Sequence, residues 1–176
     1  MAYWALKTRE SGDKGKSFDD DAEKWPLFVR DGVIAIGWIL KTSPEQLNDE
    51  ELQKALKPYG YKPGQARTAA WTIRKFQNLG DEDSILICQG YTANERPDRD
   101  IPIYGVATNI KKFRYKDNSD WWYCQHKAEI ERFGDEKGKP IKKSLFEKKL
   151  GQGSLMFTLQ PITKKGFENI VQWARH

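Results

Sequence analysis

The segment DSILICQGY, residues 83–91, is a short apolar run bounded by polar residues, and it predicts a buried β-strand. The polar loop TANERPDRDIP follows it. Next comes IYGVATNIKKFRYK, residues 103–116, in which aliphatic and small residues lead into a basic half. We expect this second segment to be one long strand whose outer half is basic. Together the two segments predict strands of a sheet around which the rest of the chain is arranged.

Four further segments predict strands, and five predict helices. The strand segments are 2–8, 33–40, 121–133 and 154–162, and the helical segments are 16–32, 42–56, 64–79, 144–151 and 163–175. The Gly- and Lys-rich segment 134–143 is expected to be a flexible connection. About six strands, with helices before, between and after them, predict an α+β fold. We expect a mixed six-stranded sheet curled into a partly closed β-barrel and surrounded by helices.

The length and composition predict a single domain spanning residues 1–176. The chain has 176 residues, of which 38% are hydrophobic and 31% charged. No apolar stretch approaches the roughly 18 residues that a membrane span requires, and we find no secretory signal, so we expect a cytoplasmic protein with no membrane partner. Cys88 and Cys124 lie in apolar strand-like runs without the spacing of a zinc site, and we expect buried, reduced thiols.

The tryptophan content is high. The chain contains seven Trp residues, and its formal net charge of +5 permits an anionic partner. Aromatic residues interleaved with Lys and Arg are what base stacking combined with phosphate contact would require. Several tryptophans are nevertheless expected to fill the core, because they sit among apolar neighbours at strand or helix spacing: Trp4, Trp25, Trp71 and Trp173.

The loop ESGDKGKS, residues 10–17, partly matches the phosphate-binding loop of nucleotide hydrolases. Gly15, Lys16 and Ser17 fit the pattern, but its first glycine falls on Glu10. A carboxylate there would face the phosphates with negative charge, whereas the motif needs freed backbone N–H groups. The sequence therefore does not predict a nucleotide triphosphate site.

The sequence does not indicate an enzyme. Only one internal histidine, His126, is available for a nucleophilic triad, and no nucleophile shares its segment. Asp98 and Asp100 could belong to a magnesium-dependent nuclease, but Asn109 stands where that site needs an acid. As an alternative, both aspartates are turn residues beside Pro97. We expect no catalytic residues, no metal and no cofactor, and the nuclease remains an alternative reading.

Taken in chain order, five segments resemble the EVE domain, a member of the PUA-like group that also includes the YTH readers of methylated RNA. These segments are YWALKTRES (3–11), GDEDSILICQGY (80–91), IYGVATNIKKFRYKD (103–117), WWYCQHKAEI (121–130) and KKLGQGSLMFTLQPITKKGFENIV (148–171). DGVIAIGWIL (31–40) also resembles the opening module of some modification-dependent restriction systems. One departure is the helical stretch 43–59, which a minimal EVE domain lacks.

The resemblance implies a non-catalytic reader of modified DNA. Such a reader flips one base out of its strand and tests it in an aromatic pocket. We expect N6-methyladenine as the base, and we expect the domain to be monomeric and to serve a restriction system with a motor ATPase and a nuclease. An RNA reader remains the alternative, because the same fold type serves both nucleic acids.

The resemblance also implies the residues of the pocket. It is expected to be formed by Trp38, Tyr91, Trp121, Trp122, Thr8, Arg9 and Gln89. Neighbouring strand residues face opposite ways, so one of Trp121 and Trp122 should face the pocket and the other the core; we expect Trp122 in the pocket. Phosphate contacts are expected from basic side chains, namely Lys16, Arg74, Lys75, Lys111, Lys112, Arg114, Lys142, Lys143, Lys148 and Lys149.

Overall fold

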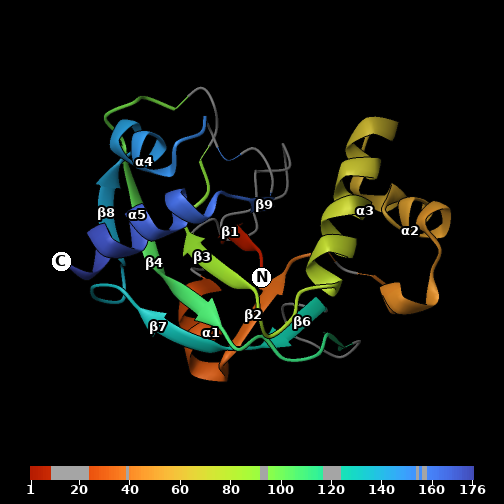
Figure 1. Cartoon of the computed structure of the whole chain (residues 1–176). Coiled ribbons are helices and arrows are strands. Elements are labelled where there is room, and N and C mark those ends of the chain that lie inside the picture. Colours follow the sequence, from red (N-terminus) through yellow and green to blue (C-terminus); the bar gives the residue numbers. More distant parts are fainter. Residues whose placement is uncertain (9–23, 39, 92–94, 117–123, 154, 156–157) are drawn as a thin grey trace.

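A computed structural model describes residues 1–8, 24–38, 40–91, 95–116, 124–153, 155 and 158–176 (Figure 1). Nine strands and five α-helices lie within these residues. Strands and helices are intermixed along the chain, which confirms the predicted α+β class. No helix within the described ranges is both long and apolar enough to cross a bilayer.

The larger sheet has six strands: β1 (Tyr3–Lys7), β3 (Ser84–Cys88), β4 (Asp100–Thr108), β7 (Glu129–Arg132), β8 (Lys139–Lys142) and β9 (Leu159–Pro161). Their order is β7-β4-β3-β1-β9, and β8 also pairs with β4. β1 and β3 run parallel, so their carboxyl ends lie at the same edge. The other pairs are antiparallel. The sheet is therefore mixed, as predicted.

A second sheet of three strands has the order β2-β6-β5. Its strands are β2 (Val33–Ile36), β5 (Arg114–Tyr115) and β6 (Cys124–Lys127), and both pairs are antiparallel. The prediction placed all strands in one partly closed barrel. The structure instead shows two sheets, without barrel closure among the described residues.

The two faces of the larger sheet pack against different layers, because alternate strand residues point to opposite faces. Leu6, Ile85 and Ile87 belong to one cluster, which also contains the buried side of the second sheet. Ala5 and Leu86 belong to another cluster, shared with the last two helices. Figure 1 shows these helices, in blue, on one side of the larger sheet and the yellow and orange helices on the other.

The five α-helices are α1 (Lys24–Asp31), α2 (Asp49–Ala55), α3 (Pro63–Gln77), α4 (Lys143–Leu150) and α5 (Lys164–Arg175). Two short 3₁₀ turns, η1 (Pro44–Gln46) and η2 (Lys57–Tyr59), flank α2. The helix predicted over 42–56 is thus divided. Asn48 begins α2 with a capping box, in which its side chain accepts from the Glu51 N–H and the Glu51 side chain accepts from the Asn48 N–H.

Two predicted strand boundaries and one predicted flexible connection are wrong. The long strand over 103–116 ends at Thr108, because Asn109 adopts a left-handed backbone with φ 50°. The segment 121–133 supplies β6 and β7, which belong to different sheets. The segment 134–143, predicted to be a flexible connection, contains β8, whose residues pair with Asp100–Ile103 of β4.

Candidate nucleic-acid interface

Trp38 follows the end of β2 and is half-buried against the first cluster. Its indole Nε1–H donates to the hydroxyl of Tyr61 at 3.1 Å. Tyr61 precedes α3 and packs, also half-buried, against the same cluster. The hydrogen bond joins two aromatic side chains from separate segments, so the orientation of the Trp38 ring is fixed. We call these two residues the Trp38–Tyr61 pair.

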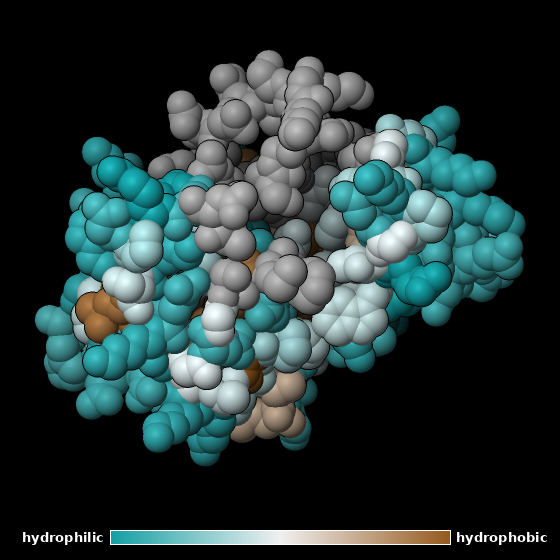
Figure 2. Space-filling model, turned by 90° about the horizontal axis from the view of Figure 1, so that it is seen from above, coloured by the Kyte–Doolittle hydropathy of each residue, from teal (hydrophilic) through white to brown (hydrophobic). Residues whose placement is uncertain are grey.

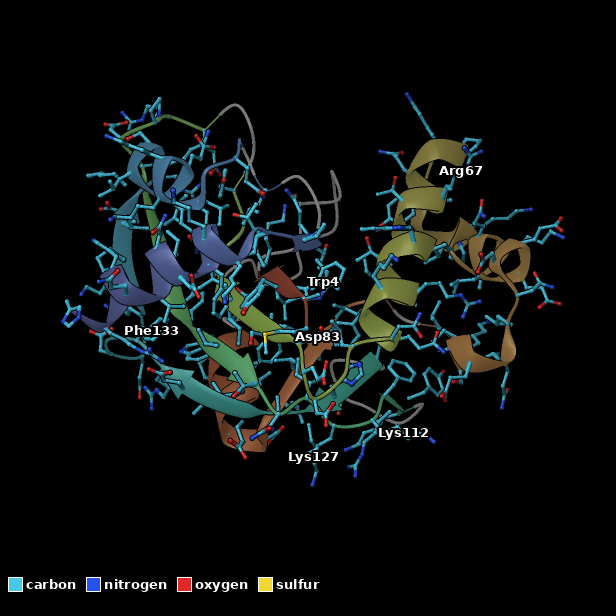
Figure 3. All side chains as sticks on the ribbon, in the orientation of Figure 1. Trp4, Arg67, Asp83, Lys112, Lys127 and Phe133 are labelled. Carbon is cyan, nitrogen blue, oxygen red and sulfur yellow. The ribbon has the colours of Figure 1, made fainter. Side chains whose placement is uncertain are left out.

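Trp4 lies on β1, on the side that faces α3 (Figure 3). It is half-buried and packs against the first cluster. Its indole Nε1 is buried and has no hydrogen-bond partner among the described residues. A buried N–H without an acceptor costs free energy, about 1–3 kcal/mol. Trp4 was predicted to be a core residue, and the structure adds an unsatisfied donor on the α3 side of the sheet.

Thr8 and Gln89 lie where β1 and β3 end. Thr8 is buried, and both its backbone N–H and its hydroxyl donate to the carbonyl oxygen of Cys88, at 3.0 Å and 3.4 Å. Gln89 is half-buried, and its backbone N–H donates to the Pro102 oxygen. Because β1 and β3 are parallel, the structure brings these two predicted pocket residues to one edge of the sheet.

The packing of Tyr91 does not support its predicted role as a pocket wall. Only 5% of Tyr91 is exposed, and it belongs to the second cluster, on the opposite face of the sheet from Trp38. Its ring meets Phe146 edge-on at 6.1 Å, and its hydroxyl accepts from the Leu155 N–H at 3.0 Å. Burial raises the pKa of the Tyr91 hydroxyl. The structure therefore separates Tyr91 from the Trp38–Tyr61 pair.

Four predicted site residues lie outside the described residues. Arg9 and Lys16 belong to the segment after β1, and Trp121 and Trp122 belong to the segment before β6. The loop 10–17, discussed above for its glycines, also lies there. The choice between Trp121 and Trp122 stays a prediction.

The Arg74 guanidinium is held by hydrogen bonds inside the protein, and its predicted phosphate contact stays a prediction. Its guanidinium donates to the Asp49 carboxylate at 2.8 Å, to the Pro44 oxygen at 2.6 Å, to the Gln77 side chain at 3.0 Å and to the Leu47 oxygen. These bonds occupy all three guanidinium nitrogens. Four of its five N–H donors are thereby directed at oxygens of the protein itself.

Lys143 is likewise engaged inside the protein. Only 5% of it is exposed, its Nζ donates to the Glu95 oxygen at 2.9 Å, and the same Nζ lies 5.3 Å from the Tyr91 ring centroid. Lys142 is exposed, but it pairs with Asp100 at 3.1 Å. A phosphate contact of Lys143 would compete with this hydrogen bond, and one of Lys142 would compete with an ion pair, so both contacts stay predictions.

The remaining described candidates are at the surface. Exposed side chains are Lys75, Lys111, Lys112, Arg114 and Lys148, and Lys149 is half-buried. Lys111 and Lys112 follow β4, whereas Lys148 and Lys149 are on α4, on the other side of the larger sheet (Figures 1 and 3). Figure 2 shows that the described surface on both sides of the view is mostly hydrophilic. The candidates thus form two separate basic regions.

Of the four tryptophans predicted to be core residues, only Trp25 is fully buried, and Trp4 is half-buried as described above. Trp25 is 1% exposed, as predicted, and stacks on Tyr104 with a centroid distance of 5.4 Å. Trp71 is 38% exposed, which makes it a surface residue. Trp173 is half-buried, with Lys139 Nζ at 5.1 Å from its ring centroid. The helical period places Trp71 away from the buried side of α3, a signal that the sequence contained.

The thiols are buried, and the acidic residues that were candidates for a nuclease are exposed. Cys88 and Cys124 are buried free thiols, as predicted, and burial raises the pKa of each to about 12. Asp98 and Asp100 are exposed and lie 3.7 Å and 3.1 Å from Arg96 and Lys142. Within the described residues, no three His, Cys, Asp or Glu side chains are grouped to hold a metal.

No known protein-family model matches the sequence, and a search of curated proteins found no similar sequence. The resemblance to the EVE domain is therefore carried by the segments quoted above.

Proposed function

We propose that residues 1–176 form an EVE-type reader domain with a PUA-like fold, which binds DNA containing a modified base and flips that base into an aromatic pocket. N6-methyladenine is the proposed base. The domain has no catalytic activity of its own, acts as a monomeric module, and selects DNA for a motor ATPase and a nuclease of a restriction system.

The observation that carries the proposal is the Trp38–Tyr61 pair. A flipped base needs a flat, rigid stacking partner, and stacking on an aromatic side chain is worth roughly 1–3 kcal/mol. The hydrogen bond at 3.1 Å holds the Trp38 ring in place before a ligand binds. Little rotamer freedom is therefore lost when a base stacks on it. The half-buried ring at a strand end matches the position expected for a pocket wall.

Two further observations support a nucleic-acid ligand. The buried Trp4 N–H has no acceptor among the described residues, so it is a donor that a ligand can satisfy. Residues 57–80 contain five Lys or Arg residues and no Asp or Glu, so the segment that includes Tyr61 and α3 is strongly basic. Positive charge beside the pocket favours the phosphates of a bound strand.

A binding titration tests the proposal. Fluorescence anisotropy measures the affinity for three ligands. They are a DNA duplex with one N6-methyladenine on one strand, the same duplex without the modification, and the matching RNA. We expect tighter binding to the hemimethylated DNA. A 2-aminopurine next to the modified base should brighten when the base leaves the stack. Equal affinity for methylated and unmodified duplexes contradicts the proposal, and preference for methylated RNA supports the RNA alternative instead.

The Trp38–Tyr61 pair is tested by two variants. Trp38→Ala should abolish the preference for the methylated base, because the stacking surface is lost. Circular dichroism verifies that the variant is folded. Tyr61→Phe keeps both rings and removes the hydroxyl that accepts from Trp38, and we expect a smaller loss. Unchanged preference in folded Trp38→Ala protein would show that Trp38 is no pocket wall.

A further inference from the structure

The outward side of α3 carries an exposed aromatic residue between two cations. Arg67, Trp71 and Lys75 follow one another at four-residue spacing, so they lie along one line of the helix, about 6 Å apart in rise. All three are exposed. The Nζ of Lys75 lies 5.8 Å from the Trp71 ring centroid. The buried residues of α3, among them Ala69 and Ile73, lie on the opposite side.

The charge of this region is unbalanced. Among the basic residues of 57–80, Arg74 is occupied by the Asp49 carboxylate and backbone oxygens. The other four are exposed, namely Lys57, Lys62, Arg67 and Lys75. This segment contains no acidic residue, and the acidic residues nearest to α3 lie in the first turn of α2, so the positive charge is concentrated on α3 and the residues before it.

The C-terminal end of α3 lies close to the segment after β4, which carries Lys111 and Lys112. The imidazole of His126 lies between the Phe76 oxygen, at 2.7 Å, and the Lys111 oxygen, at 2.6 Å. His126 thus contacts the backbone of Phe76, the residue after Lys75, and the backbone of Lys111. Figure 3 shows Arg67 near one end of α3 and Lys112 beyond the other. We call Arg67, Trp71, Lys75, Lys111 and Lys112 the α3 basic face.

We infer that the α3 basic face binds single-stranded nucleic acid, with one unpaired base stacked on Trp71 and the phosphates of the strand next to the surrounding cations. Aromatic residues on a positively charged surface are the usual means of holding single strands without reading sequence. An acidic peptide would satisfy the charges but would offer no flat partner to the indole. The inference shares with the proposed function only a nucleic-acid ligand, and it does not need a modified base.

The experiment is a titration of a fluorescein-labelled, unmodified oligothymidylate with the full chain. We expect Trp71→Ala to weaken binding about 10-fold, the value of stacking one base. Leu145→Ala is the matched control, because Leu145 on α4 is 39% exposed, close to the 38% of Trp71. We expect no change for Leu145→Ala, and Arg67→Gln with Lys75→Gln should flatten the salt dependence. Thermal unfolding verifies that each variant is folded.

The inference and the proposed function can fail separately. Trp71-dependent binding of oligothymidylate without preference for methylated duplexes overturns the proposed function and supports the α3 basic face. Preference for methylated duplexes with undiminished oligothymidylate binding by Trp71→Ala overturns the α3 basic face alone. Tighter binding of a polyglutamate peptide than of oligothymidylate would also overturn it, since the partner would then be an acidic protein.

Discussion

His126 is fully buried, and both of its ring nitrogens face backbone oxygens, at 2.6 Å and 2.7 Å. A carbonyl oxygen can only accept, so a neutral imidazole donates to one of the two and presents a lone pair to the other. Burial lowers the pKa of His126 from 6.5, and the two carbonyl contacts oppose this shift. The net lowering means that the folded protein holds a neutral His126 at neutral pH.

Acid should therefore destabilise the protein through His126. Below about pH 6.5 the histidine of the unfolded chain gains a proton, whereas the folded chain with its lowered pKa does not until lower pH, so the free energy of unfolding falls as pH falls. Urea unfolding at several pH values measures this dependence. In His126→Gln the contribution that appears below about pH 6.5 should disappear. The same pH dependence in both proteins would contradict this assignment.

At the residue scale, the spacing of apolar residues can predict whether a side chain is buried, but it does not predict its hydrogen-bond partner. Trp71 was predicted to be a core residue because it sits at helix spacing among apolar neighbours, but neighbours along a helix are about 100° apart and face different directions. Trp38 was assigned from the resemblance, and its partner Tyr61 was not predicted. The two belong to segments separated by 23 positions, and no local pattern encodes their hydrogen bond.

At the scale of elements, Arg74 connects α3 with η1 and the start of α2. We expect Arg74→Met to lower the free energy of unfolding by about 2–3 kcal/mol, because it leaves the Pro44 and Leu47 oxygens without their charged donor. Arg74→Lys should restore little of the lost free energy of unfolding, since an ammonium group cannot reproduce the forked geometry of the guanidinium. Urea unfolding measures both.

Lys75→Met is the matched control for this prediction. Lys75 is the next residue along α3 and is exposed, so its replacement should change the free energy of unfolding by no more than about 0.5 kcal/mol. Equal effects of Arg74→Met and Lys75→Met would show that the contact between α3 and α2 contributes nothing specific to stability.

Element types could be predicted from the sequence better than element boundaries. The helical period identified α3 and α5, and apolar β-branched runs identified β2 and β3. The β6–β7 boundary could not be predicted, because one continuous segment supplies strands to two sheets and only long-range pairing separates them. The capping box of Asn48 and Glu51 was a local signal for the start of α2 that the prediction did not use.

At the scale of the whole molecule, the predicted α+β class follows from local patterns, whereas sheet closure does not. Closure depends on how strands far apart in the chain pair, and the described residues form a six-stranded and a three-stranded sheet. The same limit applies to the candidate site. Trp38 and Tyr91 are both aromatic residues beyond strand ends, but the two faces of the larger sheet separate them.

The basic residues are also divided between two sides of the molecule. On the α4 side, local partners occupy several cations: Lys142 pairs with Asp100, Lys143 bonds the Glu95 oxygen, and Lys139 bonds the Trp173 oxygen. On the α3 side, Lys75, Lys111 and Lys112 are exposed beside a segment without acidic residues. A phosphate that approaches the α3 side therefore meets more exposed cations that are not already bonded to an oxygen of the described residues.

The salt dependence of DNA binding should report this difference. Each phosphate contact contributes about 0.9 to the slope of log affinity against log salt concentration. We expect the triple variant Lys75→Gln, Lys111→Gln, Lys112→Gln to lower the slope by about 2–3 for an unmodified duplex, measured between about 50 mM and about 200 mM salt. The control triple variant Lys142→Gln, Lys148→Gln, Lys149→Gln has the same change in net charge. If it flattens the slope as much, the effect comes from total charge, and the phosphates are not held specifically on the α3 side.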